Sequence, residues 1–135
     1  MHIKELLASE TWALRHEVLW PNMPFEYVKV ANDNTGFHYG LFIGDTLVSV
    51  ISLFIDNEKA QFRKFATKTN FQRKGYGSQL LKYTLSKAAE SSEVTTVFCN
   101  ARKDSKLFYE RFGMRVTDDT YLKGGVEFVV MELHF

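Results

Sequence analysis

The fold of this chain is decided by the segment Gln72-Arg73-Lys74-Gly75-Tyr76-Gly77-Ser78 and by what lies on either side of it. An apolar run before it predicts a strand over residues 59–67, and leucines and alanines at helical spacing after it predict a helix over 75–90. The β-branched run that follows predicts a buried strand over 94–99. A strand, a helix and a second strand in this order form a right-handed parallel crossover. We therefore expect an α/β (α+β mixed) fold, a mixed sheet with helices on both faces.

The same segment predicts an anion-binding site. A loop between a strand end and a helix start leaves several backbone N–H groups unpaired, and the helix dipole adds partial positive charge there. Gly75 and Gly77 let a ligand approach the backbone, and Arg73 and Lys74 add full charges, which suits a pyrophosphate. No Gly-Lys-Ser/Thr follows as in a P-loop, and Leu80 stands where a dinucleotide fingerprint has its third glycine. A Gly-x-Gly alone more often marks the flexible start of a helix with solvent-exposed cations than an anion-binding site. A second motif is therefore needed to decide between the two interpretations.

The rest of the chain predicts shorter elements around this unit. Ser9 is expected to cap a first helix that ends at Pro21, and a polar loop over 21–36 follows. The remaining expectations are a hairpin of strands 38–43 and 47–55 joined by Gly44-Asp45, a short helix with Asp104 as N-cap and Gly113 after its end, and a closing strand over 126–135.

Size and composition narrow the class of protein. A chain of 135 residues with 45% apolar residues predicts one folded domain, residues 1–135. Its 17 basic and 16 acidic residues nearly cancel, which gives no reason to expect nucleic acid as a partner. The single cysteine, Cys99, excludes an intrachain disulfide and a multi-cysteine metal site, and the four histidines lack ligand spacing. Without a signal-like or membrane-spanning apolar stretch, we expect a cytoplasmic protein with no membrane partner.

Two motifs together resemble the GNAT superfamily of N-acetyltransferases. The family's Gln/Arg-x-x-Gly-x-Gly/Ala matches QRKGYG at 72–77, and its Phe-Tyr-x-x-x-Gly-Phe matches FYERFGM at 108–114, with Met114 in place of the last aromatic. Residues 14–21, the Gly44-Asp45 hairpin and residues 99–102 also resemble a branch of the family whose substrates are uncharacterised. The resemblance implies a GNAT-type splayed sheet, acetyl-CoA as acyl donor and no metal.

The resemblance also implies which residues hold the donor. In the family, the strand at Phe65-Ala66-Thr67 pairs with the pantetheine arm, as an added β-strand would, and the loop amides hold the pyrophosphate. The strand ending at Asn100 forms the other side of the cleft, and Arg102 stands where most members have an asparagine. The cofactor-binding residues expected on this basis are Phe65, Ala66, Thr67, Gln72, Arg73, Lys74, Gly75, Tyr76, Gly77, Ser78, Asn100 and Arg102.

Tyr109 is the expected catalytic residue. An amine that attacks a thioester expels a thiolate, and a tyrosine hydroxyl near the sulfur can protonate it as a general acid. A backbone N–H of the strand 65–67 can stabilise the oxyanion. The alternative is a structural tyrosine whose hydroxyl is bonded within the protein.

The general base is not readable from the sequence. Many GNAT members place a glutamate on the strand before the phosphate loop, where this chain has Gln61 and Arg63. Glu58, Glu127 and His38 are conceivable bases, each more simply read as a surface or turn residue. A chain of water molecules that leads the proton to solvent is a further alternative.

The functional prediction is an N-acetyltransferase that acetylates a primary amine of a small molecule or peptide by direct attack. The alternative is a catalytically weak module that binds and senses acyl-CoA. A nucleotide-binding protein lacks the lysine and metal-binding groups it would need. The resemblance implies that acceptor specificity resides in the segment 20–36 and in the last hairpin near 123–125, but no motif there encodes the identity of the acceptor. A homodimer formed through the C-terminal strand is left open.

Overall fold

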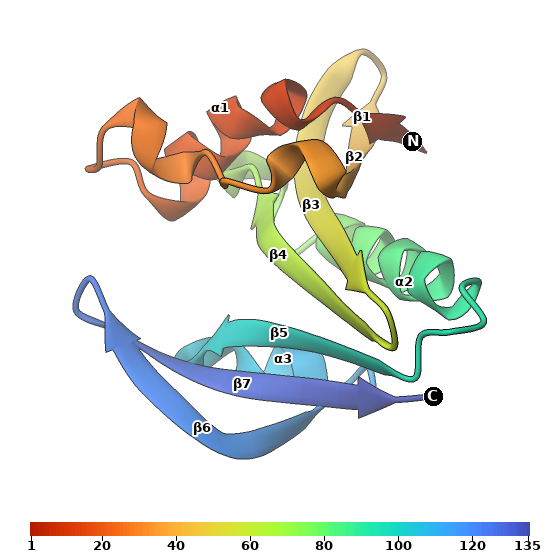
Figure 1. The fold of residues 1–135 in the computed structure, drawn as a ribbon. Coiled ribbons are helices and arrows are strands. Elements are labelled where there is room, and N and C mark those ends of the chain that lie inside the picture. The colour runs from red at the N-terminus through yellow and green to blue at the C-terminus, as the bar shows by residue number, and fades with distance from the viewer.

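A computed structural model describes residues 1–135. Its seven strands form one sheet in the order β1-β2-β3-β4-β5-β7-β6 (Figure 1). The strands are β1 (His2–Leu6), β2 (Phe37–Ile43), β3 (Thr46–Asp56), β4 (Lys59–Thr67), β5 (Thr96–Arg102), β6 (Arg115–Lys123) and β7 (Val126–His134). The α-helices are α1 (Trp12–Leu14), α2 (Tyr76–Ala89) and α3 (Lys106–Glu110). The expected mixed α/β fold is confirmed.

The sheet opens at its centre. All neighbouring strands are antiparallel except β4 and β5, which run parallel as the crossover predicts. These two pair over only three residues, from Lys59 with Thr96 to Gln61 with Phe98. Beyond Gln61 and Phe98 they diverge, so the sheet has the form of a V whose two arms are visible in Figure 1.

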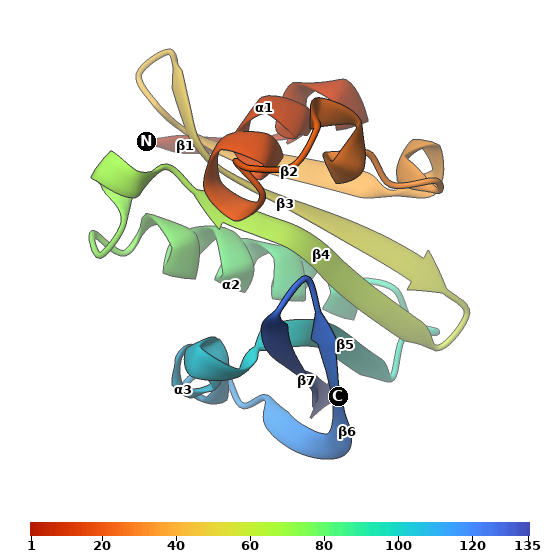
Figure 2. The same ribbon diagram turned by 90° about the vertical axis from the view of Figure 1, so that its left-hand side faces the viewer.

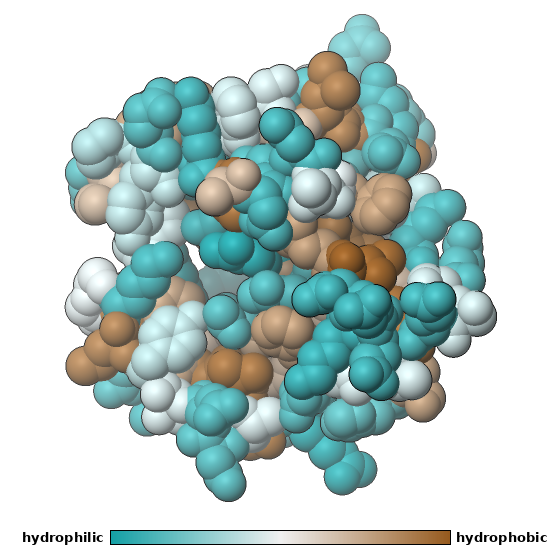
Figure 3. Space-filling model, in the orientation of Figure 1, coloured by the Kyte–Doolittle hydropathy of each residue, from teal (hydrophilic) through white to brown (hydrophobic).

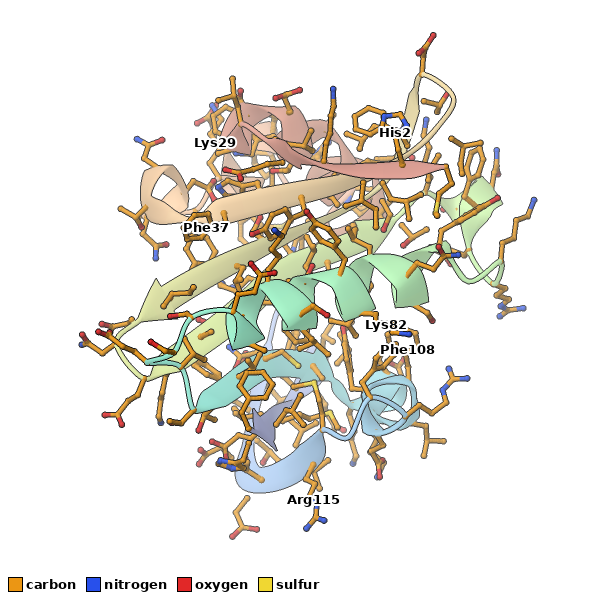
Figure 4. The ribbon with its side chains drawn as sticks, turned by 90° about the vertical axis from the view of Figure 1, so that its right-hand side faces the viewer. His2, Lys29, Phe37, Lys82, Phe108 and Arg115 are labelled. Atoms are coloured by element: carbon orange, nitrogen blue, oxygen red, sulfur yellow. The ribbon has the colours of Figure 1, made fainter.

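Helices cover both faces of the sheet. The apolar side of α2 lies against the first arm, with Leu80, Leu81 and Ala88 fully buried in the main core (Figure 4). The helical turns between residues 8 and 35 cover the opposite face, where Leu14 packs with Ala66 in a smaller cluster (Figure 2). Burial of these apolar side chains is the main favourable term for the fold.

A buried ion pair fixes the N-terminal segment to the sheet. Arg15 is fully buried and contacts Asp33 through two bonds of 2.9 and 3.0 Å. It also donates to the carbonyl oxygen of Val28 and to Ser52 Oγ of β3, both at 2.9 Å. The indole N–H of Trp12 donates to the same Asp33 carboxylate. The carboxylate also accepts from the backbone N–H of Val30, so it closes the 12–35 segment on itself, while Arg15 joins that segment to β3 through Ser52.

The prediction of one regular helix capped by Ser9 is wrong. The segment consists of a 3₁₀ turn (Ala8–Thr11), the short α1 and a π-helical turn (Arg15–Leu19), and Leu7 takes the cap position. Arg15 points inward beside Leu14, so the buried side is not the narrow apolar stripe of a regular α-helix.

The outer strands of the sheet and the N-cap of α3 also differ from the sequence prediction. The sequence did not predict β1, and it indicated β6 only through the hairpin near 123–125, without its bounds. Both are outer strands of the sheet and mostly exposed, so they lack an alternating apolar pattern. Asp104 caps no helix through its side chain, because a 3₁₀ turn (Lys103–Ser105) precedes α3. Gly113 does adopt the positive φ, 89°, expected of a glycine after a helix end.

Candidate active site

A cavity of about 930 Å³ lies in the opening of the V. It is lined by the C-terminal half of β4, the loop before α2, the end of β5, α3 and the β6–β7 hairpin. In the space-filling view it is seen as a hollow left of centre, with hydrophilic side chains around its mouth (Figure 3). The divergence of β4 from β5 thus creates the site.

The donor half of the cavity, defined here as residues 65–67 and 72–78, is built from backbone and glycine. Gly75 has a φ of 85° and occupies the N-cap position of α2, and no side chain caps the first N–H groups of that helix. These N–H groups are therefore available to an anion. Arg73, with a φ of 62°, holds the same loop in a left-handed turn.

Close packing brings this loop to the end of β4. A Cβ at Gly77 would lie 3.1 Å from Thr67 Oγ1 and 3.3 Å from the Phe65 ring, so only glycine lets the helix start approach the strand freely. Gln72 Nε2 donates to the Thr67 carbonyl oxygen at 2.9 Å and ties the loop to the strand. The strand end and the helix start thus form one continuous wall.

Ten of the twelve predicted cofactor residues line the cavity. The two exceptions are Lys74, whose amino group lies 5.9 Å from the Phe71 ring, and Tyr76, which packs beside the same ring. Both remain beside the loop, but their side chains point to Phe71. The contacts that the ten make with a ligand stay predictions.

Tyr109 lies in the cavity wall, with its ring 5.7 Å from that of Phe62 and 5.2 Å from that of Phe108. Phe108, labelled in Figure 4, lies on the part of α3 that faces α2. Burial is the main cause that raises the pKa of Tyr109, with Arg102 acting in the opposite direction. A raised pKa keeps the hydroxyl protonated at neutral pH, which is the form a general acid needs.

None of the conceivable bases reaches the cavity. His38 is buried between Ser52 Oγ at 2.7 Å and the Asp33 carbonyl oxygen at 2.8 Å. Glu127 pairs with Lys103 outside the cavity, and Glu58 lies in the turn before β4. The one carboxylate among the residues that line the cavity is Asp104.

Cys99 lines the same cavity but is buried, and burial raises the pKa of its thiol to about 12. The thiol is therefore protonated at neutral pH and is a poor nucleophile. This agrees with its predicted role as a small core residue.

The side of the cavity away from the phosphate loop is called the acceptor half here and consists of Trp20, Arg63, Lys64, Arg102, Tyr121 and Lys123. Trp20 and Lys123 come from the two segments expected to determine acceptor specificity, Arg102 is also one of the expected cofactor residues, and no sequence signal placed Lys64 or Tyr121 here. The Arg102 guanidinium donates to the Leu19 carbonyl oxygen at 3.0 Å and lies 5.4 Å from the Trp20 ring. Across the opening, a Cβ at Gly124 would lie 3.2 Å from Trp20, so the β6–β7 hairpin meets the N-terminal segment over the cavity. Distant parts of the chain therefore close this half.

Lys64 has an unusual environment. Its φ of 55° marks an irregularity where β4 and β3 change register, between Arg63 and Ala66. Burial lowers the pKa of Lys64 to about 8, and the charges of Arg63, Lys123 and Arg15 add to this, whereas Asp33 opposes it. No sequence motif indicates that this lysine lies in a cavity.

Comparison with known families assigns the fold. The model of the acetyltransferase (GNAT) domain matches residues 16–135. The chain belongs to the GNAT acetyltransferases.

A curated relative supports this membership, and two solved structures share the fold. YitI of Bacillus subtilis (strain 168), described as an uncharacterised N-acetyltransferase, is 31% identical over 124 residues, which cover 85% of this chain and 83% of that protein. The crystal structure of Escherichia coli ElaA superposes with a TM-score of 0.82 at 20% identity, over 97% of both chains. A GNAT family acetyltransferase from Elizabethkingia anophelis, solved with acetyl-CoA bound, superposes with a TM-score of 0.79 at 18% identity, over 99% of this chain and 97% of that one. The resemblance read from the two motifs is confirmed, and this GNAT chain is an N-acetyltransferase that performs acyl transfer.

Two absences complete the description of this GNAT domain. No group of three or more His, Cys, Asp or Glu side chains is placed to hold a metal ion. None of its helices combines the length and the apolar character that a membrane crossing requires.

Proposed function

We propose that this chain transfers an acetyl group from acetyl-CoA to the primary amine of a small molecule or peptide by direct attack. The observation that carries the proposal is the single cavity in which uncapped helix N–H groups and Tyr109 line the same space between diverging strands. GNAT membership supports acetyl-CoA as the donor, and the acetyl-CoA complex of the Elizabethkingia relative agrees with it.

Acetyl-CoA supplies the thioester, and the chain's residues bind and orient it. The N–H groups of Arg73 to Ser78 bind the pyrophosphate, and the unpaired edge of Phe65 to Thr67 pairs with the pantetheine. A backbone N–H of that edge donates to the carbonyl oxygen as negative charge develops on it.

The proposed reaction is balanced in atoms and charge. The amine nitrogen forms a bond with the carbonyl carbon, and the carbon–sulfur bond breaks. The Tyr109 hydroxyl gives its proton to the leaving sulfur and regains one from the amine nitrogen through solvent. An acceptor that enters as an ammonium ion loses two protons in all, of which the thiol keeps one and solvent takes the other.

One observation favours the second candidate, a module that binds acyl-CoA without turnover. Asp104 is the one carboxylate that lines the cavity, and the strand glutamate of many relatives is replaced by Gln61 and Arg63. A protein with a bound donor and no route for the amine proton would act as a sensor.

Release of free CoA thiol with a panel of primary amines tests the proposal, alongside calorimetric titration of acetyl-CoA. Thiol release that depends on an amine supports the enzyme. Tight acetyl-CoA binding without release for every amine supports the sensing module. Absence of acetyl-CoA binding contradicts both.

A further inference from the structure

The charges in the cavity are strongly one-sided. The whole chain is balanced, with 17 basic and 16 acidic residues. The residues that line the cavity include a single carboxylate, Asp104, and six cations: Arg63, Lys64, Arg73, Arg102, Arg111 and Lys123. Composition does not produce this excess, so the fold has gathered the cations here.

Phosphate binding does not account for all of them. Arg73 belongs to the loop at the start of α2. The start of this helix contacts Thr67 at Gly77. Arg63 and Lys64 lie four and three residues earlier on the strand, which at about 3.3 Å per residue places them about 10–13 Å from that loop. This distance puts them beyond a pyrophosphate bound at the loop.

Lys123 reaches the same region from the second arm of the V. It lies close enough to Lys64 for its charge to affect that lysine, and its amino group is 5.7 Å from the Tyr27 ring. Burial raises the pKa of the Tyr121 hydroxyl, and the charge of Arg63 opposes this. The Tyr121 ring stacks on that of Phe128, with 5.2 Å between the ring centroids. The cations Arg63, Lys64 and Lys123 and the rings of Tyr121 and Phe128 thus line the cavity on the side away from the phosphate loop.

These cations have no anionic partner in the protein. The ion pairs of the chain are Arg15–Asp33, Lys29–Glu26, Lys87–Glu90, Lys103–Glu127 and His134–Glu132. Neither Arg63, Lys64 nor Lys123 belongs to any of them. Like charges held together repel one another, and burial strengthens the repulsion, so the arrangement favours entry of an anion.

Building on the proposed function, we propose that the acceptor is a small primary amine that also bears a carboxylate or phosphate group, bound by Arg63, Lys64 and Lys123. Guanidinium and ammonium groups both make strong charge-assisted hydrogen bonds to these anions. Trp20 and Tyr121 provide the apolar walls for the carbon skeleton between anion and amine. Polycationic amines are rejected, because they would bring further positive charge into this half.

The same charges account for the lack of a carboxylate base. A positive environment disfavours the ammonium form of the acceptor and lowers its pKa, so the bound amine loses its proton more readily to water at the mouth of the cavity. The anion of the acceptor supplies the binding energy that holds the amine in this environment. An uncharged or cationic amine lacks that compensation.

Pairs of acceptors that differ in one anionic group test the proposal. For carboxylate, amino acids are compared with their carboxamides, and for phosphate, phosphoethanolamine is compared with ethanolamine; spermidine serves as the polycation. We expect at least one anionic member to have a KM about tenfold or more below that of its uncharged partner. The pair with the larger ratio identifies the anion. The proposal is overturned, with acetyl transfer left intact, if the uncharged member of both pairs is used as well as or better than its anionic partner, or if spermidine is used as well as the anionic acceptors.

Substitutions of the cavity cations test whether these residues bind the anionic group of the acceptor. Arg63→Gln and Lys123→Gln should raise the KM of the anionic acceptor about tenfold and leave its uncharged partner and the KM of acetyl-CoA unchanged. Lys82→Gln, an exposed lysine of α2 outside the cavity (Figure 4), is the matched control and should change neither KM. An equal effect of Arg63→Gln on both members of a pair contradicts the proposal.

Binding decides the question if turnover is absent. Calorimetric titration of the same pairs into the CoA-saturated protein requires no reaction. Tighter binding of the anionic member that Arg63→Gln abolishes supports the site, and equal binding of both members overturns it. Loss of CoA binding itself is instead a failure of the proposed function, and the two failures are therefore distinct.

Discussion

The two halves of the cavity are built in opposite ways. The donor half uses backbone N–H groups, a free strand edge and two glycines from one continuous stretch, residues 65–78. The acceptor half uses side chains from four separate parts of the chain, represented by Trp20, Lys64, Arg102 and Lys123. A backbone site can bind one ligand in many relatives whatever the side chains are, whereas a side-chain site can change with each substitution. This difference explains why two motifs indicate the donor half of this chain and no motif identifies its acceptor.

The largest expected effect is on the ion pair that supports the acceptor half. Asp33→Asn leaves the guanidinium of Arg15 buried without its counter-charge, which should lower the free energy of unfolding by about 3–5 kcal/mol. Urea denaturation measures the loss. Asp118→Asn, at an exposed position of β6, is the control and should stay within about 0.5 kcal/mol of the parent. A loss below about 1 kcal/mol for Asp33→Asn would show that the pair does not hold this segment.

The next largest expected effect is on the catalytic step assigned to Tyr109. Tyr109→Phe removes the proposed proton donor but keeps the ring packed against Phe62, so kcat should fall about 10²–10⁴-fold with the KM of acetyl-CoA unchanged. Steady-state kinetics of thiol release measure both constants. Tyr83→Phe, on α2 outside the cavity, is the matched control. A normal kcat in Tyr109→Phe would return this tyrosine to a structural role.

A substitution in the donor half should weaken the binding of CoA. Gly77→Val places branched carbons against Thr67 and Phe65, so we expect about tenfold weaker CoA binding by calorimetry. Ser86→Val adds the same side chain at an exposed position of the same helix and should leave CoA binding unchanged. If Gly77→Val binds CoA normally, close contact between the helix start and the strand is not what forms the phosphate site.

The smallest effect is a pH dependence confined to the acceptor half. Because burial lowers the pKa of Lys64 to about 8, this lysine is mostly charged below pH 8 and mostly neutral above it. Binding of an anion without an amine, such as inorganic phosphate or a simple carboxylate, should therefore weaken about threefold between pH 7 and pH 9. Phosphate changes its own ionisation near pH 7, so the carboxylate gives the cleaner measurement. In Lys64→Gln this dependence should be lost, and in Lys82→Gln it should remain.

The same contrast explains what the sequence could predict. The role of Gly75 and Gly77 depends on the local backbone, so both glycines can be recognised in the sequence. Together with Phe108 and Tyr109 they indicated the family, the fold and the donor half. Lys64 and Lys123 come together only after β4 and β6 take their places in the sheet, and the sequence predicted the hairpin near 123–125 but not the bounds of β6. Its residues alternate poorly because it is an exposed outer strand. Arg15 likewise reads as a surface residue until Asp33 is placed beside it.

The divergence of β4 and β5 gives this sheet two open edges in its interior, besides those of β1 and β6. An open strand edge invites another extended chain to pair with it, and proteins commonly guard such edges with charged side chains, lysine above all, and with irregularities in the strand. β4 has both at its opening, Arg63 and Lys64 at the change of register, and β5 ends in Arg102. We therefore expect Arg63 and Lys64, which we assign to recognition of the acceptor, also to disfavour pairing of this open edge with another chain when the cavity is empty.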